Sequence, residues 1–215
     1  MMGVPAEVID VPKCLGDRGQ CDARLALLRS PLMGELTAFV ELVRIESGEP
    51  DVPYFDPLDG GIEAECLFLL EAPGPKAVLS GFVSRNNPDE TAKNWFELNL
   101  EAGIDRRRTI MWNIVPWYIG RDGGIRPATT VDLELGLPYL HRLVSLLSAL
   151  RVVALVGKKA GRARTSIQAW ASRLTIIELP HPSPVFLNRR PHHRDLVRQG
   201  LQHVREVLDG TEVVA

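Results

Sequence analysis

The segment Cys66-Leu-Phe-Leu-Leu70, followed directly by Glu71-Ala-Pro-Gly74, decides the fold of this chain. Its apolar residues do not alternate with polar ones, which is typical of a strand buried on both faces of a parallel sheet. Three further apolar runs of similar length follow, and helical segments separate them, which predicts successive β-α-β units. These further strands are expected at residues 109–115, 152–156 and 174–179.

Segments with helical apolar spacing connect the predicted strands. We expect helices at 24–28, 36–45, 91–102, 132–150, 158–172 and 194–208, and loops at 47–61 and 120–130. Glycines and prolines within residues 1–21 indicate an irregular N-terminal arm, so that residues 22–215 form a single domain. The predicted fold class is α/β, a three-layer α/β/α sandwich with a central four-stranded parallel sheet.

The end of each predicted strand carries residues suited to a functional site. In chain order these are Glu71 to Gly74, Asn113, Gly157-Lys158-Lys159 and His181-Pro-Ser-Pro184. Because open parallel sheets place their sites at the carboxyl ends of strands, we expect the four segments to border one crevice. The prolines next to His181 and Ser183 restrict the backbone there to extended conformations.

The order and spacing of these motifs resemble the uracil-DNA glycosylase superfamily, and most closely its thermophilic-type family 4 branch. That branch has Gly-Glu-Ala-Pro-Gly as its first motif, His-Pro-Ser-Pro as its second, and an asparagine at the end of a middle strand. The matching residues are Leu70 to Gly74, His181 to Pro184 and Asn113, and the resemblance covers roughly residues 65–208. Leu70 replaces the first glycine of the family motif, which leaves the backbone path before Glu71 open.

A glycosylase takes a base out of the stack, holds it in a pocket and stabilises charge while the glycosidic bond breaks. His181 is suited to donate a hydrogen bond to a carbonyl oxygen of the leaving uracil. Asn113 offers a donor and an acceptor, which match the Watson–Crick edge of uracil and not that of cytosine. Glu71 is suited to orient or activate the attacking water, which is also the role that the resemblance implies. Each residue has a structural alternative: a turn cap for His181, a turn former for Asn113 and a carboxylate bonded to backbone amides for Glu71.

The resemblance implies further contacts with the substrate. Phe82 matches the phenylalanine that stacks on the extruded base. Val185 matches the wedge that fills the gap left in the DNA, and Phe186 is an equally suitable wedge. We also expect Ala72 and Gly74 to bind the substrate.

The charge of the chain is −2, which does not by itself indicate a nucleic-acid-binding protein. The basic residues are clustered, however, in one run within 158–173 and a second within 189–194, each next to a predicted strand end. We therefore expect phosphate contacts from this surface, the alternative being a solvated basic face. The predicted DNA contacts are Ser183, Val185, Phe186, Lys158, Arg189 and Arg190.

The three cysteines, Cys14, Cys21 and Cys66, favour a reducing, cytosolic setting with free thiols. Family 4 members bind an iron–sulfur cluster through four cysteines, which this chain cannot supply, so we expect no cluster and no other metal or cofactor. No apolar run reaches the roughly 18 residues of a membrane span, and no signal-peptide pattern is present. We expect a cytoplasmic monomer, nucleoid-associated in a bacterium, with no membrane partner.

These features predict a DNA glycosylase that hydrolyses the N-glycosidic bond of uracil in DNA, releases free uracil and starts base-excision repair. Its activity on hypoxanthine or xanthine, and its preference for single or double strands, stay open. One alternative is a non-catalytic protein of the same fold that binds uracil-containing or single-stranded DNA. Another is an α/β protein whose His-Pro-Ser-Pro tetrad is structural and which binds no DNA.

Overall fold

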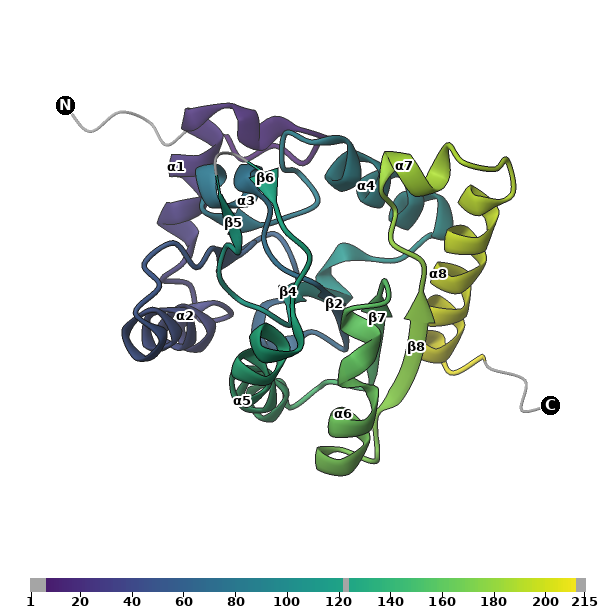
Figure 1. Ribbon diagram of the computed structural model, residues 1–215. Helices are drawn as coiled ribbons and strands as arrows, with labels where there is room; N and C mark the ends of the chain where they lie inside the picture. The colour runs from purple at the N-terminus through teal and green to yellow at the C-terminus, as the bar shows by residue number, and fades with distance from the viewer. Residues whose placement is uncertain (1–6, 122–123, 212–215) are drawn as a thin grey trace.

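A four-stranded parallel sheet in the order β4-β2-β7-β8 forms the centre of the molecule (Figure 1). The computed structural model describes residues 7–121 and 124–211. The strands of the central sheet are β2 (Cys66–Leu70), β4 (Thr109–Asn113), β7 (Val152–Val156) and β8 (Thr175–Leu179). Both inner strands are buried nearly throughout, which is why their sequences are continuous apolar runs.

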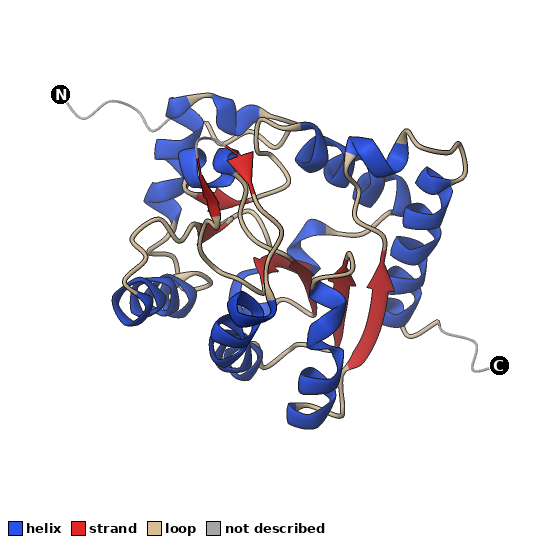
Figure 2. Ribbon diagram, in the orientation of Figure 1, coloured by secondary structure: helices blue, strands red, loops and turns tan. Residues whose placement is uncertain are grey.

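Helices cover both faces of the sheet (Figures 1 and 2). On one face α4 (Glu90–Ala102) packs against α8 (His193–Asp209), and on the other α5 (Thr130–Leu146) contacts α6 (Arg164–Trp170). The predicted three-layer α/β/α sandwich is therefore confirmed. Because all four strands are parallel, their carboxyl ends meet at one edge of the sheet. Across residues 7–121 and 124–211, none of the helices combines the length and apolar character needed to cross a membrane.

The prediction of an irregular N-terminal arm is wrong for its last residues, because two helices begin before residue 21. Residues Cys14–Gly16 form the short helix η1, and Arg18–Leu27 form α1. The α1 helix begins where it does because the carboxylate of Asp17 accepts a hydrogen bond from the backbone N–H of Gly19 at 2.6 Å. Residues 1–6 of the predicted arm lie outside the described residues, and the second N-terminal helix is α2 (Gly34–Ser47).

Several short elements occur where loops or longer helices were expected. The strand β1 (Tyr54–Phe55) pairs with β3 (Phe82–Val83), and β5 (Gly120–Arg121) pairs with β6 (Gly124–Ile125), while residues 122–123 lie outside the described part. The predicted helix at 158–172 is divided into η4 (Ala160–Ala163) and α6. The remaining short helices are η2 (Gly61–Glu63), α3 (Pro75–Ser80), η3 (Arg106–Arg108) and α7 (Pro184–Leu187).

A buried ion network joins α1 to the rest of the fold. Arg24 of α1 is fully buried and donates to the carboxylate of Asp56, which also accepts from Arg106 at 2.9 Å. Burial alone would raise the pKa of Asp56, but the two guanidinium groups outweigh it and hold that pKa below its usual value. Ser84 donates to the same carboxylate. The network thus fixes Ser84, whose side chain borders the cavity described next.

Candidate active site

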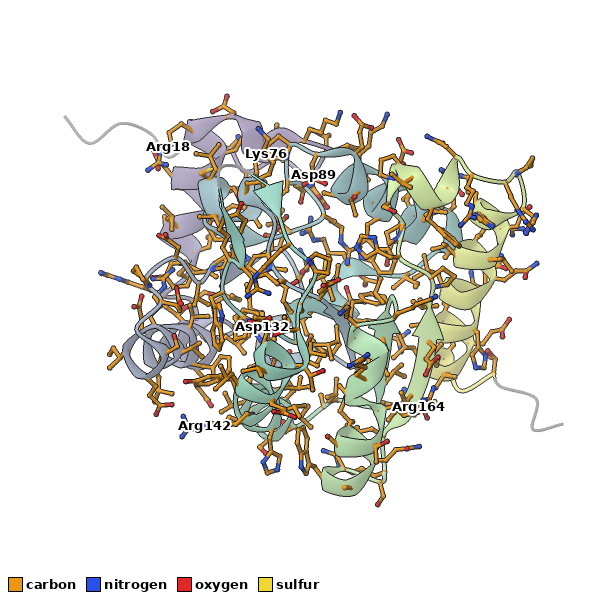
Figure 3. All side chains as sticks on the ribbon, in the orientation of Figure 1. Arg18, Lys76, Asp89, Asp132, Arg142 and Arg164 are labelled. Atoms are coloured by element: carbon orange, nitrogen blue, oxygen red, sulfur yellow. The ribbon has the colours of Figure 1, made fainter. Side chains whose placement is uncertain are left out.

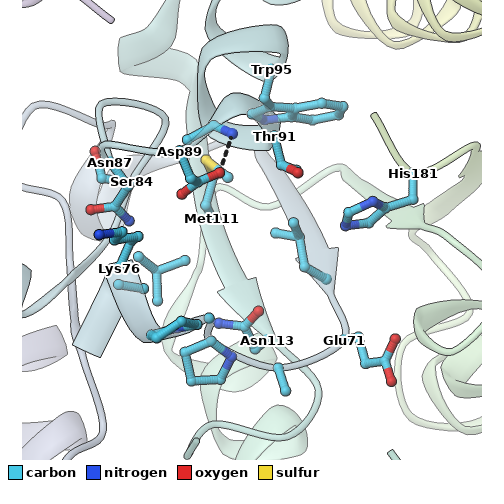
Figure 4. Close-up of a pocket in the computed structure, with 18 of the residues that line it drawn as sticks. Glu71, Lys76, Ser84, Asn87, Asp89, Thr91, Trp95, Met111, Asn113 and His181 are labelled. Carbon is cyan, nitrogen blue, oxygen red and sulfur yellow. Dashed lines mark hydrogen bonds between the residues drawn. The ribbon is translucent and has the colours of Figure 1, made fainter. Parts of the chain in front are cut away.

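A cavity of about 480 Å³ opens at the carboxyl edge of the sheet (Figure 4). It lies among the ends of β2 and β4, the helices α3 and α4, and the segment that follows β8. The structure brings five of the predicted site residues to its lining, namely Glu71, Ala72, Gly74, Asn113 and His181. Three of the four predicted segments therefore meet in one crevice, whereas Gly157, Lys158 and Lys159 do not line the cavity.

Glu71 directly follows β2, and the backbone there stays regular. Leu70 is in register with Asn113 of β4, and the backbone N–H of Val115 donates to the carbonyl oxygen of Glu71 at 3.0 Å. Leucine in place of the family's glycine therefore does not interrupt the strand pairing. The Oε1 atom of Glu71 accepts a hydrogen bond from the backbone N–H of Ala128 at 2.6 Å. No other hydrogen bond joins this carboxylate to a described residue, so Oε2 is available to a ligand.

Asn113 is the last residue of β4, and its amide borders the cavity (Figure 4). The residue is only 3% exposed. Within residues 7–121 and 124–211, no hydrogen bond to its side chain is formed. A nearly buried carboxamide normally has partners, so this one is suited to pair with a polar ligand.

His181 is placed by contacts from two neighbouring elements. Gly157, which follows β7 with φ 85°, approaches so closely that an added Cβ would lie 3.2 Å from the Cβ of His181. Asn94 of α4 donates to the carbonyl oxygen of Pro182 at 3.0 Å. The sequence carries no signal for the role of Asn94, because a polar residue on an amphipathic helix is ordinary.

Burial lowers the pKa of His181, although the nearby carboxylates of Glu71 and Asp89 oppose the shift. The imidazole is therefore neutral at pH 7 and has one N–H to donate. In Figure 4 the ring points into the cavity on the same side as Glu71, with Asn113 below and Trp95 above.

The wall formed by residues 83–95 contains side chains that sequence analysis did not single out: Val83, Ser84, Asn87, Asp89, Thr91, Ala92 and Trp95. Phe82, which was expected to stack on the base, does not reach the cavity. Its ring is fully buried and lies 6.5 Å from the ring of Tyr54, because β3 pairs with β1 and directs Phe82 into the core. Trp95 brings an aromatic ring to the lining instead. Its position on an amphipathic helix resembles that of an ordinary core residue.

The basic surface is smaller than the sequence suggested. Lys158, Arg189 and Arg190 are exposed and form no ion pair with a described residue. The other basic side chains of the two runs are mostly engaged: Arg164 pairs with Glu178 at 2.8 Å, and Arg173 donates to the carbonyl oxygen of Leu150. Figure 3 shows Arg164 well apart from Lys76 and Asp89, which line the cavity.

The two candidate wedge residues differ in the structure. Val185, at the start of α7, is 84% exposed. Phe186 stacks on the ring of His193 with the centroids 4.1 Å apart. Ser183 caps this short helix by accepting a hydrogen bond from the backbone N–H of Phe186. Of these two side chains, Val185 is therefore the more exposed.

The cysteines do not fit the four-thiolate cluster of family 4 proteins. Cys66 lies within β2 in the core, whereas Cys14 and Cys21 belong to η1 and α1. Among the residues that the structure describes, no group of three or more His, Cys, Asp or Glu side chains is arranged to hold a metal ion.

The fold and the strand-end cavity agree with a comparison of the sequence with known families. Residues 57–205 match the uracil DNA glycosylase superfamily, and because this match spans well over half of the chain, the protein belongs to that superfamily. No curated protein matches the sequence. Membership supports a glycosylase-like function at the level of the superfamily.

The lowered pKa of His181 predicts how stability depends on pH. The unfolded chain has a histidine pKa of about 6.5, so below that pH the unfolded state binds more protons at this position than the folded state. The free energy of unfolding should fall more steeply in the wild type than in His181→Gln when the pH drops from 7 to 5. The difference in slope is at most about 1.4 kcal/mol per pH unit. Urea denaturation at several pH values measures it, and parallel curves would contradict the assignment.

Proposed function

We propose that this protein hydrolyses the N-glycosidic bond between uracil and deoxyribose in DNA. The observation that carries the proposal is the convergence of Glu71, Asn113 and His181 on one cavity of a superfamily member. An acid–base group, a base-reading amide and a neutral hydrogen-bond donor are the three components that such a reaction needs.

In the proposed reaction, the bond between C1′ and N1 breaks and its electron pair leaves with the base. Negative charge then develops on the carbonyl oxygens of uracil, where the N–H of His181 stabilises it. The carboxylate of Glu71 balances the positive charge of the sugar and accepts a proton from the water that bonds to C1′. The proton ends on the uracil anion, and the products are uracil and an abasic site.

Asn113 is proposed to select the base. Its amide N–H donates to a carbonyl oxygen of uracil, and its oxygen accepts from the adjacent ring N–H. Cytosine presents the opposite pattern at these positions. With the amide held in one orientation, a bound cytosine would place donor against donor and acceptor against acceptor, and it would lose binding energy.

A wider range of bases is a second candidate for the substrate. The cavity of about 480 Å³ lies within the range that accepts drug-sized ligands, which are larger than one pyrimidine ring. An added Cβ at Gly74 would meet nothing within 4 Å, so the turn after Pro73 does not crowd the site. Both observations are compatible with hypoxanthine and xanthine.

The proposal is tested with end-labelled oligonucleotides that carry uracil, hypoxanthine or xanthine, as single strands and as duplexes. Alkali-labile sites should appear with the wild type and be strongly reduced by Asn113→Ala. Base release that this substitution leaves unchanged would place the activity elsewhere. Retention of uracil-containing DNA in a gel shift without any release would favour the non-catalytic binding protein.

The exposed position of Val185 predicts a difference between DNA forms. Burying a valine side chain contributes about 1.5 kcal/mol, so its loss should slow base release from a duplex about tenfold. Single strands have no stack to fill, and Val185→Ser should leave their rate unchanged. Single-turnover kinetics on both forms measure this ratio. Ile45→Ser, an equally exposed apolar position on α2, is the control, and an equal effect on both DNA forms would contradict the role.

Arg189 and Arg190 are expected to bind phosphates, since both are exposed and neither forms an ion pair with a residue that the structure describes. Replacing both with glutamine should weaken binding of single-stranded DNA. It should also reduce the slope of log K against log salt by about 1.4, because each phosphate contact contributes about 0.7. Fluorescence anisotropy at several salt concentrations measures the slope. Weaker binding with an unchanged slope would exclude phosphate contacts.

A further inference from the structure

Two adjacent lysines after β7 have different surroundings. Lys158 is exposed and has no hydrogen bond or ion pair with any described residue. Lys159 is half-buried, and its Nζ donates a hydrogen bond to the backbone carbonyl oxygen of Ala128. Only the first of these side chains is therefore free to contact DNA.

Ala128 connects Lys159 with the candidate catalytic carboxylate. Its carbonyl oxygen accepts from Lys159, while its own N–H donates to Oε1 of Glu71 at 2.6 Å. Ala128 is 1% exposed, so neither hydrogen bond is easily replaced by water. The ammonium of Lys159 thus binds the carbonyl oxygen of Ala128, and the carboxylate of Glu71 binds the N–H of the same residue.

The segment around Ala128 is held on both sides. Arg126 donates to both carboxylate oxygens of Asp132, at 2.6 and 2.8 Å. Thr129 and Asp132 form a capping box at the start of α5. Hydrogen bonding to Arg126 and Thr129 lowers the pKa of Asp132, which keeps this carboxylate charged at neutral pH. Lys159 adds the contact that ties this segment to the end of β7.

We propose that Lys159 is a positioning residue that acts on Glu71 through Ala128. By holding the carbonyl of Ala128, Lys159 directs the N–H of that residue to Oε1 of Glu71 and leaves Oε2 for the attacking water. This inference rests on the proposed function, because it assigns Lys159 a part in the same site. The inference assigns different roles to the two adjacent lysines: Lys158 contacts phosphate, and Lys159 orients the carboxylate of Glu71.

The test compares Lys159→Met, Lys159→Arg and Lys158→Met by single-turnover base release at saturating protein and by DNA-binding affinity. Lys159→Met should lower the saturated rate by about ten- to a hundredfold, because small displacements of a reacting group have effects of this size. DNA affinity should be unchanged, and Lys159→Arg should restore most of the rate. Lys158→Met should instead weaken binding and reduce the salt slope. Arg142→Met, whose side chain pairs with Glu46 on the surface, should change neither property.

A double-mutant cycle tells positioning from a general structural effect. In a protein that already carries Glu71→Ala, adding Lys159→Met should cause little further loss of rate. An equal loss in both backgrounds, or a loss of DNA affinity alone, would overturn the inference while leaving the glycosylase activity in place. Absence of base release by the unaltered protein from every substrate would overturn the proposed function, and this inference with it.

Discussion

His181→Ala should lower the single-turnover rate of uracil release by about a hundredfold to a thousandfold. The loss corresponds to about 3–4 kcal/mol, the usual contribution of one hydrogen-bond donor aimed at a developing oxyanion. The imidazole is mostly buried beside the cavity and neutral at pH 7, so its N–H does not have to be stripped of a full water shell during the reaction. Quench-flow kinetics with a uracil-containing single strand measure the rate.

The matched control for His181 is His203→Ala, which removes a surface histidine paired with Glu206 on α8. This control should release uracil at the wild-type rate. DNA affinity should also be similar in all three proteins, because the contact with His181 strengthens only as the bond breaks. A rate loss below about fivefold for His181→Ala would assign the histidine to the turn rather than to the reaction.

Glu71→Gln is expected to reduce the rate by about a hundredfold to ten-thousandfold, the range typical of a general base. Glutamine has nearly the same shape and keeps an oxygen that can accept the hydrogen bond from Ala128. What it loses is the negative charge that receives a proton and balances the cationic sugar. The rate loss therefore reports on charge rather than on the fold of the segment.

Glu178→Gln is the control for Glu71→Gln, since Glu178 is exposed and pairs with Arg164 outside the cavity. Thermal unfolding of both variants should stay close to that of the wild type. If Glu71→Gln retained more than a third of the wild-type rate, the carboxylate would be structural, and the bond from Ala128 would be its main role.

The parts of the fold that depend on local patterns were predictable. The strands β2 and β7 begin and end as expected, because continuous apolar runs bounded by polar residues define them. The helices α3 and α7 were missed, since each is short, begins at a proline and has no apolar repeat. The start of α1 was misplaced, at residue 24 instead of 18, because Gly16 and Gly19 suggested a break, whereas Asp17 caps the helix.

Some residues of the candidate site were likewise predictable from the sequence, and others were not. Glu71, Asn113 and His181 were predictable because each lies at or just after the end of a strand, and parallel strands bring their carboxyl ends together. Phe82 was misplaced because apolar aromatic residues suit a core and a base pocket equally well. The contact between Lys159 and Ala128 joins residues 31 apart in the sequence, and no periodicity or motif encodes such a pair.

The ion network at Asp56 has a consequence for how this chain can be divided. The family match begins at residue 57, whereas Asp56 and Arg24 both precede it. A polypeptide trimmed to the matched segment would lose the carboxylate of Asp56. The guanidinium groups of Arg85 and Arg106 would then share one remaining carboxylate of the network, that of Asp59. Breaking buried pairs costs about 3–5 kcal/mol, a large share of the 5–15 kcal/mol that keeps a domain folded. A polypeptide that begins at residue 57 should therefore be markedly less stable than one that keeps Arg24 and Asp56.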